Sequence, residues 1–464
     1  ETAFYLSVGN TRSMEYIEVN ISSTTSSEVR LIKSDSPDMN PQIFLPREED
    51  HLYSVDHDPA SSRFLIESNW KALNFRLLET NLNDSSDKNK WKELIPHREQ
   101  VLLQSVIPFP DHLIIMEREN GLRKLKILHK ESEAVKEINF NDPTYTAYLA
   151  SNPEYYVDRF YFGYSSMRTP DSLFSVMLSS GRKRLLKEAE VKGSFSSGDY
   201  KVDREFITAR DGTQVPVSIV YKKNKFIKNG NPIFFYGYGS YGNSIDAGFS
   251  SSRLSLLDRG FIFAIAHVRG GQELGRSWYE DGKIFNKLNT FYDFIDVTKG
   301  LLEKGYGDKD RIYAGGGSAG GLLMGAIVNM EPNLYKGIIS NVPFVDVITT
   351  MSDPSIPLTT GEYSEWGNPD IKEEFEYIMQ YSPYDNISEQ EYPSILVTAG
   401  LWDSQVQYYE PAKYVAKLRD YNKGKNPILM KVNMTAGHSG VSGRFESLKE
   451  LAMEYAFLLR LDSN

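Results

Sequence analysis

The sequence predicts an all-β N-terminal part followed by an α/β part built on a mostly parallel sheet. Two patterns indicate this division. Short strand-like segments with turn residues between them fill the chain up to about residue 190, whereas strand patterns and amphipathic helix patterns alternate beyond it. A Ser- and Gly-rich segment, residues 191–202, separates the two patterns. We therefore expect one domain over residues 1–192 and a second over residues 193–464, with helices on both faces of its sheet.

The all-β part repeats a group of four strands roughly every 40–50 residues, which is the period of β-propeller blades. Such blades bury a face only against their neighbours, so we expect about four of them. An irregular β-sandwich is the alternative that periodicity leaves open. The predicted strands are Ala3–Gly9, Met14–Ile21, Glu28–Ile32, Gln42–Leu45, Leu52–Val55, Arg63–Glu67, Leu73–Thr80, Trp91–Leu94, Val101–Ile107, Asp111–Glu117, Leu122–Leu128, Val135–Ile138, Tyr145–Leu149, Tyr156–Tyr164, Ser172–Leu178 and Arg184–Ala189.

The second part alternates strands with helices, which predicts a parallel sheet covered by helices. Thr290–Lys304 carries apolar residues near helical spacing and is predicted as an amphipathic helix. The other predicted helices are Tyr409–Tyr421 and Phe445–Leu459. The predicted strands are Val217–Tyr221, Ile233–Tyr236, Phe261–His267, Gly337–Asn341, Ser394–Ala399 and Ile428–Val432.

One stretch of this second part has the pattern of a nucleophile elbow. A strand, Arg311–Ala314, precedes Gly316-Gly317-Ser318-Ala319-Gly320, and a helix of small and apolar residues, Ala319–Val328, follows. A serine on so sharp a strand-to-helix turn projects its hydroxyl into open space, and only small neighbours fit beside it. The Ala319 amide then lies at a helix N-terminus, where it can donate to a developing oxyanion. Ser318 is therefore the candidate nucleophile.

A serine nucleophile needs a base, and the base needs an orienting acid. In an α/β-hydrolase these residues follow in the order Ser, Asp or Glu, His. Of the seven histidines only His438 comes after Ser318, so it is the candidate base. Asp403 follows a predicted strand directly and is the candidate acid. Asp346 and Asp385 are the alternatives, although either could be a cap or turn residue.

The second oxyanion donor is expected in a loop after an early strand. Phe234-Phe-Tyr-Gly-Tyr-Gly-Ser-Tyr-Gly supplies glycines and the phenols of Tyr236, Tyr238 and Tyr241. A phenol or an amide of this segment could complete the hole with the Ala319 amide, while aromatic packing is the other role for Tyr236.

Composition excludes several classes of protein. The formal charge of −10 and the lack of any Lys/Arg block argue against nucleic-acid binding. Without cysteine, the chain has no disulfide framework, cysteine nucleophile or thiolate metal site, and a cytosolic location is expected. No apolar run approaches the length of about 20 residues of a transmembrane helix. We expect no metal and no cofactor.

Several motifs together resemble the prolyl oligopeptidase family of serine peptidases, and most closely its oligopeptidase B branch. The resemblance covers nearly the whole chain, because it extends into the all-β part. These motifs are Leu94-Ile-Pro-His-Arg-Glu, Asn120-Gly-Leu, Tyr236-Gly-Tyr-Gly-Ser-Tyr-Gly, His267-Val-Arg-Gly-Gly, Gly316-Gly-Ser-Ala-Gly-Gly, Tyr381-Ser-Pro-Tyr-Asp-Asn and Ala436-Gly-His.

The resemblance implies an α/β-hydrolase domain capped by a seven-bladed β-propeller that filters substrates by size. Four predicted blades fall short of seven, so we expect about three blades and an N-terminal hydrolase segment to be absent from this sequence. By motif match the catalytic roles fall on Ser318, Asp403 and His438, with Tyr238 as a side-chain oxyanion donor.

Three substrate-binding positions depart from the family's pattern. Family peptidases carry an arginine two residues after the catalytic aspartate, whereas this chain has Gln405. Basic-specific members present two carboxylates where this chain has Glu362 and Ser364, with Glu365 next to them. Tyr377 stands where prolyl-specific members have a tryptophan that stacks on proline. A post-proline pocket is therefore not expected, and a post-Lys/Arg pocket is weakened.

The sequence thus predicts a serine hydrolase that acts through an acyl-enzyme, with weak peptidase activity. An esterase or thioesterase is the alternative, because Gln405 and Ser364 weaken peptide binding. A scaffold that recruits protein partners through the propeller is the alternative from another class. The expected substrate is a peptide or a (thio)ester.

Overall fold

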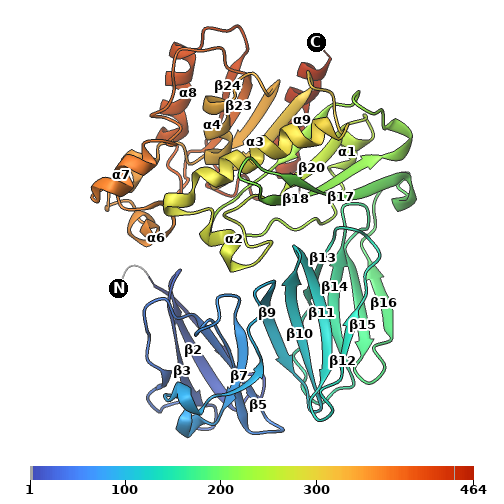
Figure 1. Ribbon diagram of the computed structural model, residues 1–464, viewed down its shortest axis with the longest axis vertical. Coiled ribbons are helices and arrows are strands. Elements are labelled where there is room, and N and C mark those ends of the chain that lie inside the picture. The colour runs from blue at the N-terminus through green and yellow to red at the C-terminus, as the bar shows by residue number, and fades with distance from the viewer. Residues whose placement is uncertain (1–3, 444, 464) are drawn as a thin grey trace. The chain divides into compact units, whose positions relative to one another are not determined.

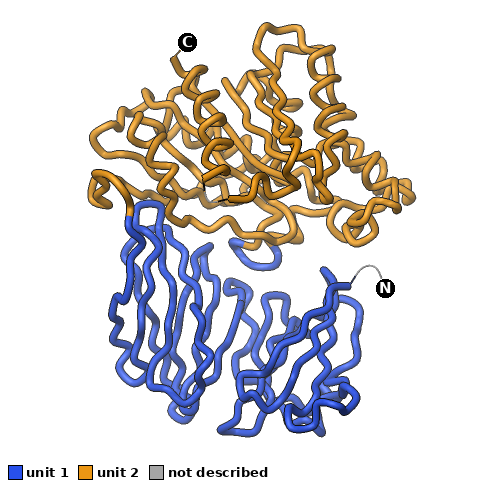
Figure 2. Tube along the Cα trace, turned by 180° about the vertical axis from the view of Figure 1, so that it is seen from behind, with its two compact units in different colours: residues 1–190, 273–277 blue, residues 191–272, 278–464 orange. Residues whose placement is uncertain are grey.

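A computed structural model describes residues 4–443 and 445–463. The chain divides into two compact units, which Figure 2 shows in different colours. Unit 1 comprises the described residues up to Glu190 together with Glu273–Ser277, and unit 2 comprises Val191–Gln272 and the residues from Trp278 onward. Within the described residues, no helix is both long and apolar enough to cross a membrane.

Unit 1 is built from four sheets, each of four antiparallel strands joined in chain order (Figure 1). The strands fall into the four groups that the sequence predicts, and the predicted start at Ala3 lies outside the described residues. The expectation of further blades concerns residues beyond this sequence and stays an expectation. The strands are β1 (Tyr5–Asn10), β2 (Tyr16–Ser22), β3 (Ser27–Lys33), β4 (Gln42–Leu45), β5 (Tyr53–Asp58), β6 (Arg63–Ser68), β7 (Arg76–Thr80), β8 (Lys92–Ile95), β9 (Val101–Pro108), β10 (His112–Glu119), β11 (Leu122–His129), β12 (Val135–Ile138), β13 (Thr146–Leu149), β14 (Arg159–Ser165), β15 (Ser172–Met177) and β16 (Lys183–Glu188).

Neighbouring sheets of unit 1 share apolar cores, as propeller blades do. Residues along a strand alternate between the two faces of a sheet, and β6 shows the consequence. Phe64 and Ile66 belong to the core shared with the first sheet, whereas Leu65 belongs to the core shared with the third. The third and fourth sheets meet in another core, which includes Ile114 and Phe160. Each inner sheet thus buries both faces.

Unit 2 is organised around one eight-stranded sheet in the order β17-β18-β20-β19-β21-β22-β23-β24. β17 and β18 pair antiparallel, and β18 pairs antiparallel with β20. The remaining pairs are parallel, which confirms the predicted mostly parallel sheet. The strands are β17 (Tyr200–Thr208), β18 (Gln214–Lys222), β19 (Ile233–Tyr236), β20 (Ile262–Ala266), β21 (Ile312–Gly317), β22 (Gly337–Asn341), β23 (Ser394–Gly400) and β24 (Ile428–Asn433).

The helices of the chain belong mainly to unit 2, where they connect strands of the sheet or, as the C-terminal helix does, follow its last strand. The α-helices are α1 (Leu254–Leu257), α2 (Arg276–Glu280), α3 (Leu288–Glu303), α4 (Ala319–Met330), α5 (Val347–Met351), α6 (Tyr363–Trp366), α7 (Lys372–Ile378), α8 (Tyr409–Tyr421) and α9 (Glu446–Asp462). Short 3-10 helices are η1 (Leu82–Asp84), η2 (Lys88–Lys90), η3 (Ser197–Asp199), η4 (Lys223–Lys225), η5 (Ile284–Asn286) and η6 (Thr359–Gly361).

Helices cover both faces of the eight-stranded sheet. Adjacent residues of β19 point to opposite faces, and the Phe235 ring contacts Phe294 of α3, which packs beside α4 (Figure 1). Phe234 points to the other face. Its register partner on β21, Tyr313, donates its hydroxyl to Asp462 of α9 at 3.3 Å. With helices on both faces, the carboxyl ends of the strands are where loops of an α/β sheet assemble a site.

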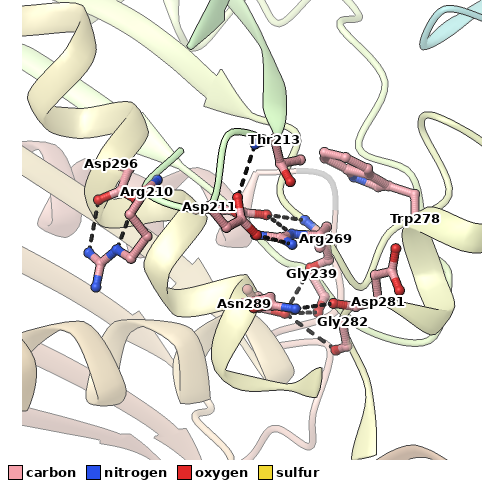
Figure 3. A network of polar contacts seen from close by, with 12 residues as sticks. Arg210, Asp211, Thr213, Gly239, Arg269, Trp278, Asp281, Gly282, Asn289 and Asp296 are labelled. Atoms are coloured by element: carbon pink, nitrogen blue, oxygen red, sulfur yellow. Dashed lines mark hydrogen bonds and ion pairs between the residues drawn. The ribbon is translucent and has the colours of Figure 1, made fainter. Parts of the chain in front are cut away.

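The loop between β20 and α2 is tied to α3 by a buried ion pair. The Arg269 guanidinium donates to both carboxylate oxygens of Asp293, at 2.9 and 2.6 Å, and Arg269 and Asp293 are 5% and 0% exposed. Asp211 accepts a further bond of 2.7 Å from Arg269 (Figure 3). A neighbouring pair, Arg210–Asp296, lies nearer the surface, and the Arg210 side chain is 44% exposed.

Asp293→Ala is expected to lower the free energy of unfolding of unit 2 by about 3–5 kcal/mol, because it leaves a buried guanidinium without its main partner. Asp296→Ala is the matched control, since an exposed pair contributes less than about 1 kcal/mol. Equilibrium unfolding in urea measures both changes. Equal losses for the two variants would contradict this account of the buried pair.

Candidate active site

Ser318 lies on the sharp turn between β21 and α4. Its φ of 56° and ψ of −119° form a backbone conformation that residues other than glycine rarely adopt. Hydrogen bonds hold the turn on two sides. The Ser318 amide donates to the Asn341 carbonyl at 2.8 Å, and the Ser318 carbonyl accepts from Gly321 at 2.8 Å and from Phe344 at 3.1 Å. The end of β22 and the first turn of α4 therefore fix the serine.

Close backbone approaches explain the glycines beside the serine. A Cβ atom on Gly316 would lie 2.4 Å from the Gly320 carbonyl oxygen, and one on Gly320 would lie 2.8 Å from the Gly237 carbonyl oxygen. Real Cβ atoms do not approach so closely, so larger side chains would displace the turn. The elbow is therefore packed against the end of β19 as well.

Asp403 and His438 meet at the carboxyl edge of the sheet. Asp403 follows β23, and His438 lies between β24 and α9. One Asp403 carboxylate oxygen accepts His438 Nδ1 at 2.7 Å, and the other accepts the amides of Gln405 and Val406, each at 2.9 Å. The Asp403 side chain is almost fully buried. The three donors fix this carboxylate toward the imidazole.

The two alternative acids have other partners. The Asp346 carboxylate forms an ion pair with Lys413, and Asp346 precedes the first residue of α5. The Asp385 carboxylate accepts the Ser382 hydroxyl at 2.6 Å, which is a local turn contact. Neither carboxylate is hydrogen-bonded to His438, whose Nδ1 is bound by Asp403.

Ser318 and His438 line different cavities. A cavity of about 230 Å³ is bordered by Ser318, whereas His438 borders one of about 380 Å³ together with Asn341 and Val342. Among the described residues, no hydrogen bond joins the Ser318 hydroxyl to the His438 ring. The two residues are connected through Asn341–Val342, which borders the His438 cavity and whose Asn341 carbonyl accepts the Ser318 amide. Catalytic hydrogen bonds commonly tighten only when substrate binds.

The cavity beside Ser318 brings together residues that are distant in the sequence. Tyr238 and Tyr241 lie in the loop after β19, and Gln405 lies in the loop after β23. Glu362 directly precedes α6. Burial raises the pKa of Tyr238 to about 12. Its phenol therefore stays protonated at neutral pH and is able to donate a hydrogen bond. The Ala319 amide, at the first position of α4, is directed out of the helix N-terminus.

Glu362 supplies a carboxyl group to this cavity. One of its carboxylate oxygens accepts the Tyr241 hydroxyl at 2.9 Å and the Trp366 indole nitrogen at 2.7 Å. Burial raises the pKa of Glu362, although these two hydrogen bonds oppose the rise. A partly desolvated carboxylate in a pocket attracts a cationic group.

The structure separates the remaining candidates. Gln405 lines the cavity and its side chain is exposed, whereas Tyr377 does not line it. The Tyr377 hydroxyl accepts the Leu288 amide at 3.1 Å, and its ring packs on Phe285 and Tyr381. Glu365 is 1% exposed and bonds inside the fold, so it does not take the place of the missing second carboxylate.

Apolar lining residues were missed by the sequence reasoning. Phe344, Met351 and Val406 border the cavity. Phe344 and Met351 lie beside and in the short helix α5, and Val406 lies in the loop after β23. The only signal for them is their proximity in sequence to the predicted Asp346 and Asp403. Among residues 4–443 and 445–463, no cluster of three or more His, Asp or Glu side chains could bind a metal ion.

The sheet order, the turn at Ser318 and the Asp–His contact at the carboxyl edge place unit 2 in the α/β-hydrolase class. Unit 1 is a β-propeller domain. Comparison with known families agrees with both. Residues 247–463 match the prolyl oligopeptidase family, and residues 1–189 match the N-terminal β-propeller domain of prolyl oligopeptidase. The chain belongs to the prolyl oligopeptidase family.

Individual relatives support the oligopeptidase B branch. The chain is 45% identical to dipeptidyl aminopeptidase BI of Pseudoxanthomonas mexicana and 42% identical to protease 2 of Moraxella lacunata, over 99% of its own length in each case. It spans 63% and 66% of these two proteins, less than two thirds of each. The solved structure of oligopeptidase B from Leishmania major has a TM-score of 0.93 at 38% identity and covers 99% of this chain, which spans 66% of it.

Prolyl endopeptidase-like proteins are more distant. From the sequence motifs alone, the animal prolyl endopeptidase-like protein is predicted to be the most similar member of the oligopeptidase B branch. The protein of that name from Xenopus laevis is 29% identical over 99% of this chain and 66% of its own length. This identity is lower than those of the two bacterial relatives, so overall similarity favours the bacterial enzymes over that animal protein.

The cavity is expected to bind a small cation such as benzamidine, and to lose affinity as the pH falls. Glu362 has a raised pKa, so its charge is present above that pKa and is lost when the pH drops through it. Glu362→Gln should weaken binding by about tenfold or more, the value of a hydrogen bond to a charged group, and should flatten the pH dependence. Calorimetric titration between pH 4 and 8 measures this, with a neutral phenyl ligand of the same size as control. Cation binding that changes neither with pH nor on Glu362→Gln substitution would contradict the role of Glu362 in binding the cation.

Proposed function

We propose that this chain is a serine hydrolase that cleaves peptides through an acyl-enzyme, with Ser318 as the nucleophile. The observation that carries the proposal is the 2.7 Å contact between Asp403 and His438 Nδ1 at the same sheet edge as the strained turn at Ser318. Membership of the prolyl oligopeptidase family supports the same reaction class.

The proposed first half-reaction forms an ester. The Ser318 oxygen attacks the scissile carbonyl while His438 Nε2 removes its proton, and Asp403 keeps the Nδ1 proton in place and stabilises the imidazolium. For this step the imidazole approaches Ser318 within hydrogen-bond distance. His438 then gives the proton to the leaving amine, and water hydrolyses the ester through the same base.

Two donors are proposed to stabilise the oxyanion. The Ala319 amide lies at the N-terminus of α4, where the helix dipole also favours negative charge. The Tyr238 phenol lines the cavity with Ser318 and remains protonated, since burial raises its pKa to about 12. Such donors contribute most when they are fixed before the charge develops.

The proposed substrates are short peptides with a cationic group next to the scissile bond. Glu362 supports the cation preference, and the relatives named dipeptidyl aminopeptidase, protease and oligopeptidase support a peptide substrate. Among the described residues that line the cavity there is one carboxylate, Glu362, whereas basic-specific relatives are expected to have two; Ser364 stands in place of the second. The preference is therefore expected to be weaker than in those relatives, and Tyr377, outside the cavity, is not expected to contribute.

Esters and thioesters are the second proposed substrate class, supported by Gln405. This side chain lines the cavity without a positive charge. An arginine there would hold a substrate carbonyl through a charge-assisted hydrogen bond. Amide hydrolysis depends on such positioning, because the amine leaves only after protonation, whereas activated esters depend on it less.

Ser318→Ala is expected to abolish covalent labelling by a fluorophosphonate probe. His438→Ala and Asp403→Asn should slow labelling by roughly 10⁴-fold, because the asparagine favours the wrong imidazole tautomer and the three residues act as a unit. Asp346→Asn is the matched control, since its carboxylate pairs with Lys413, and it should change the rate by no more than a few-fold. Labelling of the Ser318→Ala variant, or equal losses for Asp346→Asn and Asp403→Asn, would refute the assignment.

Gln405→Arg is expected to raise kcat/KM for an amide substrate with lysine at P1 by about 10- to 100-fold, since a hydrogen bond to a charged group is worth about 1.5–3 kcal/mol. The matched ester should gain much less, because its leaving group departs readily. Gln405→Met keeps similar bulk without a donor and serves as the control. If the unaltered protein already cleaves the amide as efficiently as the ester, the inference from Gln405 is wrong.

A further inference from the structure

The loop Tyr238–Gly242 carries two side chains of the cavity on an unusual backbone. Tyr238 and Tyr241 both line the cavity with Ser318. Gly239, Tyr241 and Gly242 have φ values of 72°, 60° and 65°, all in the left-handed region. A tyrosine in this region is disfavoured, and such conformations persist where the surrounding structure holds them. The contacts that hold this loop therefore bear on both tyrosines.

Lys287, at the N-terminal end of α3, holds the loop through hydrogen bonds. Its side chain is fully buried, and its ammonium group donates to the Gly239 carbonyl at 2.6 Å, to the Ser240 hydroxyl at 2.8 Å and to the Gly282 carbonyl at 3.2 Å. These acceptors use the three N–H donors of a lysine. Two of the three belong to the loop, so the lysine positions the loop against the segment before η5.

Glu365 holds the same loop from α6. It is 1% exposed, and one carboxylate oxygen accepts the Tyr241 amide at 2.9 Å while the other accepts the Tyr279 hydroxyl at 2.5 Å. Glu362, three residues earlier, accepts the Tyr241 hydroxyl at 2.9 Å. Tyr241 is therefore held at its backbone by one carboxylate and at its phenol by another.

Lys287 and Glu365 each favour the charged form of the other, although no direct ion pair joins them. Burial lowers the pKa of Lys287 to about 8, and the charge of Glu365 opposes that fall. Burial raises the pKa of Glu365, and the charge of Lys287 opposes that rise. Apolar side chains of the same size would fill the space without the cost of desolvating charges. An apolar pair, however, would not form the hydrogen bonds that Lys287 and Glu365 make to the loop.

The loop also contacts the backbone at Gly270. The Gly242 amide donates to the Gly270 carbonyl at 2.9 Å, and a Cβ atom on Gly270 would lie 2.0 Å from the Gly239 carbonyl oxygen. Figure 3 shows Gly239 beside Gly282 and Arg269 beside Asp211. The amide and guanidinium of Arg269, one residue before Gly270, are both bonded to Asp293, which holds that backbone in place.

On the basis of the proposed function, we propose that Lys287 and Glu365 are positioning residues that fix the Tyr238–Gly242 loop. Lys287 acts on the loop through Gly239 and Ser240, and Glu365 acts on it through the Tyr241 amide. Together they align the phenol of Tyr238 with the oxyanion and set the contact of Tyr241 with Glu362. One buried charged couple thus controls both turnover and the preference for a cationic substrate.

A double-mutant cycle tests this coupling on ester substrates with lysine or norleucine at P1. Tyr238→Phe should lower kcat by about 10²-fold. Lys287→Met should lower kcat by about 10- to 100-fold alone but by less than about threefold in the Tyr238→Phe background, because it acts through that phenol. It should also reduce the lysine-to-norleucine ratio of kcat/KM at least fivefold, and not further in a Glu362→Gln background. Equal fold losses in both backgrounds would overturn the proposal.

Controls separate positioning from loss of stability. Arg311→Met removes the bidentate pair with Asp462 at the opposite end of β21, so it should lower thermal stability without changing kcat or the selectivity ratio. Ser240→Ala removes one acceptor of Lys287 and should reproduce its pattern at smaller size, which keeps the test decisive if Lys287→Met does not fold. A kinetic change for Arg311→Met that equals that for Ser240→Ala would also overturn the proposal.

The same assay distinguishes this inference from the proposed function. Ser318→Ala is measured first. Hydrolysis that survives Ser318→Ala refutes the proposed function, whereas hydrolysis that depends on Ser318 together with an additive cycle refutes only the role of Lys287 and Glu365.

Discussion

The backbone turn at Ser318 is the constraint on which the rest of the site depends. Its left-handed conformation costs about 1–3 kcal/mol in a residue other than glycine, and it is retained because β22, α4 and the end of β19 hold it through hydrogen bonds and glycine contacts. The turn exposes one hydroxyl and the first amides of α4 at the carboxyl edge of the sheet. Loops after β19, β23 and β24 then bring Tyr238, Asp403 and His438 to that edge.

The polar groups around this turn are restrained to different degrees. Asp403 accepts three hydrogen bonds and is buried, so its orientation is determined before any substrate arrives. His438 is only partly buried, and Asp403 accepts its Nδ1, so Nε2 is the ring nitrogen that the proposed mechanism directs toward the serine. Lys287 and Glu365 are buried and form hydrogen bonds that hold the strained Tyr238–Gly242 loop. In the proposed mechanism, rigid oxyanion donors and a less restrained base suit a reaction in which the oxyanion site is ready first.

The elements with strong sequence patterns are predicted correctly from the sequence. The bounds of β19, β22 and α8 agree with the structure, and the four strand groups of unit 1 are confirmed. The sequence does not predict β17, an edge strand with many polar residues that begins inside the predicted linker. Buried charges such as Lys287 and Glu365 could not be predicted, because a lysine at a helix start resembles a solvated one. Their partners lie 48 and 124 residues away in the sequence.

A structure of the chain with a phosphonate bound covalently would decide whether Ser318 is the nucleophile. We predict the phosphorus on the Ser318 oxygen, a phosphonyl oxygen within hydrogen-bond distance of both the Ala319 amide and the Tyr238 hydroxyl, and the His438 ring next to the serine oxygen while it keeps its bond to Asp403. An adduct on another residue, or a phosphonyl oxygen bound by neither donor, would contradict it.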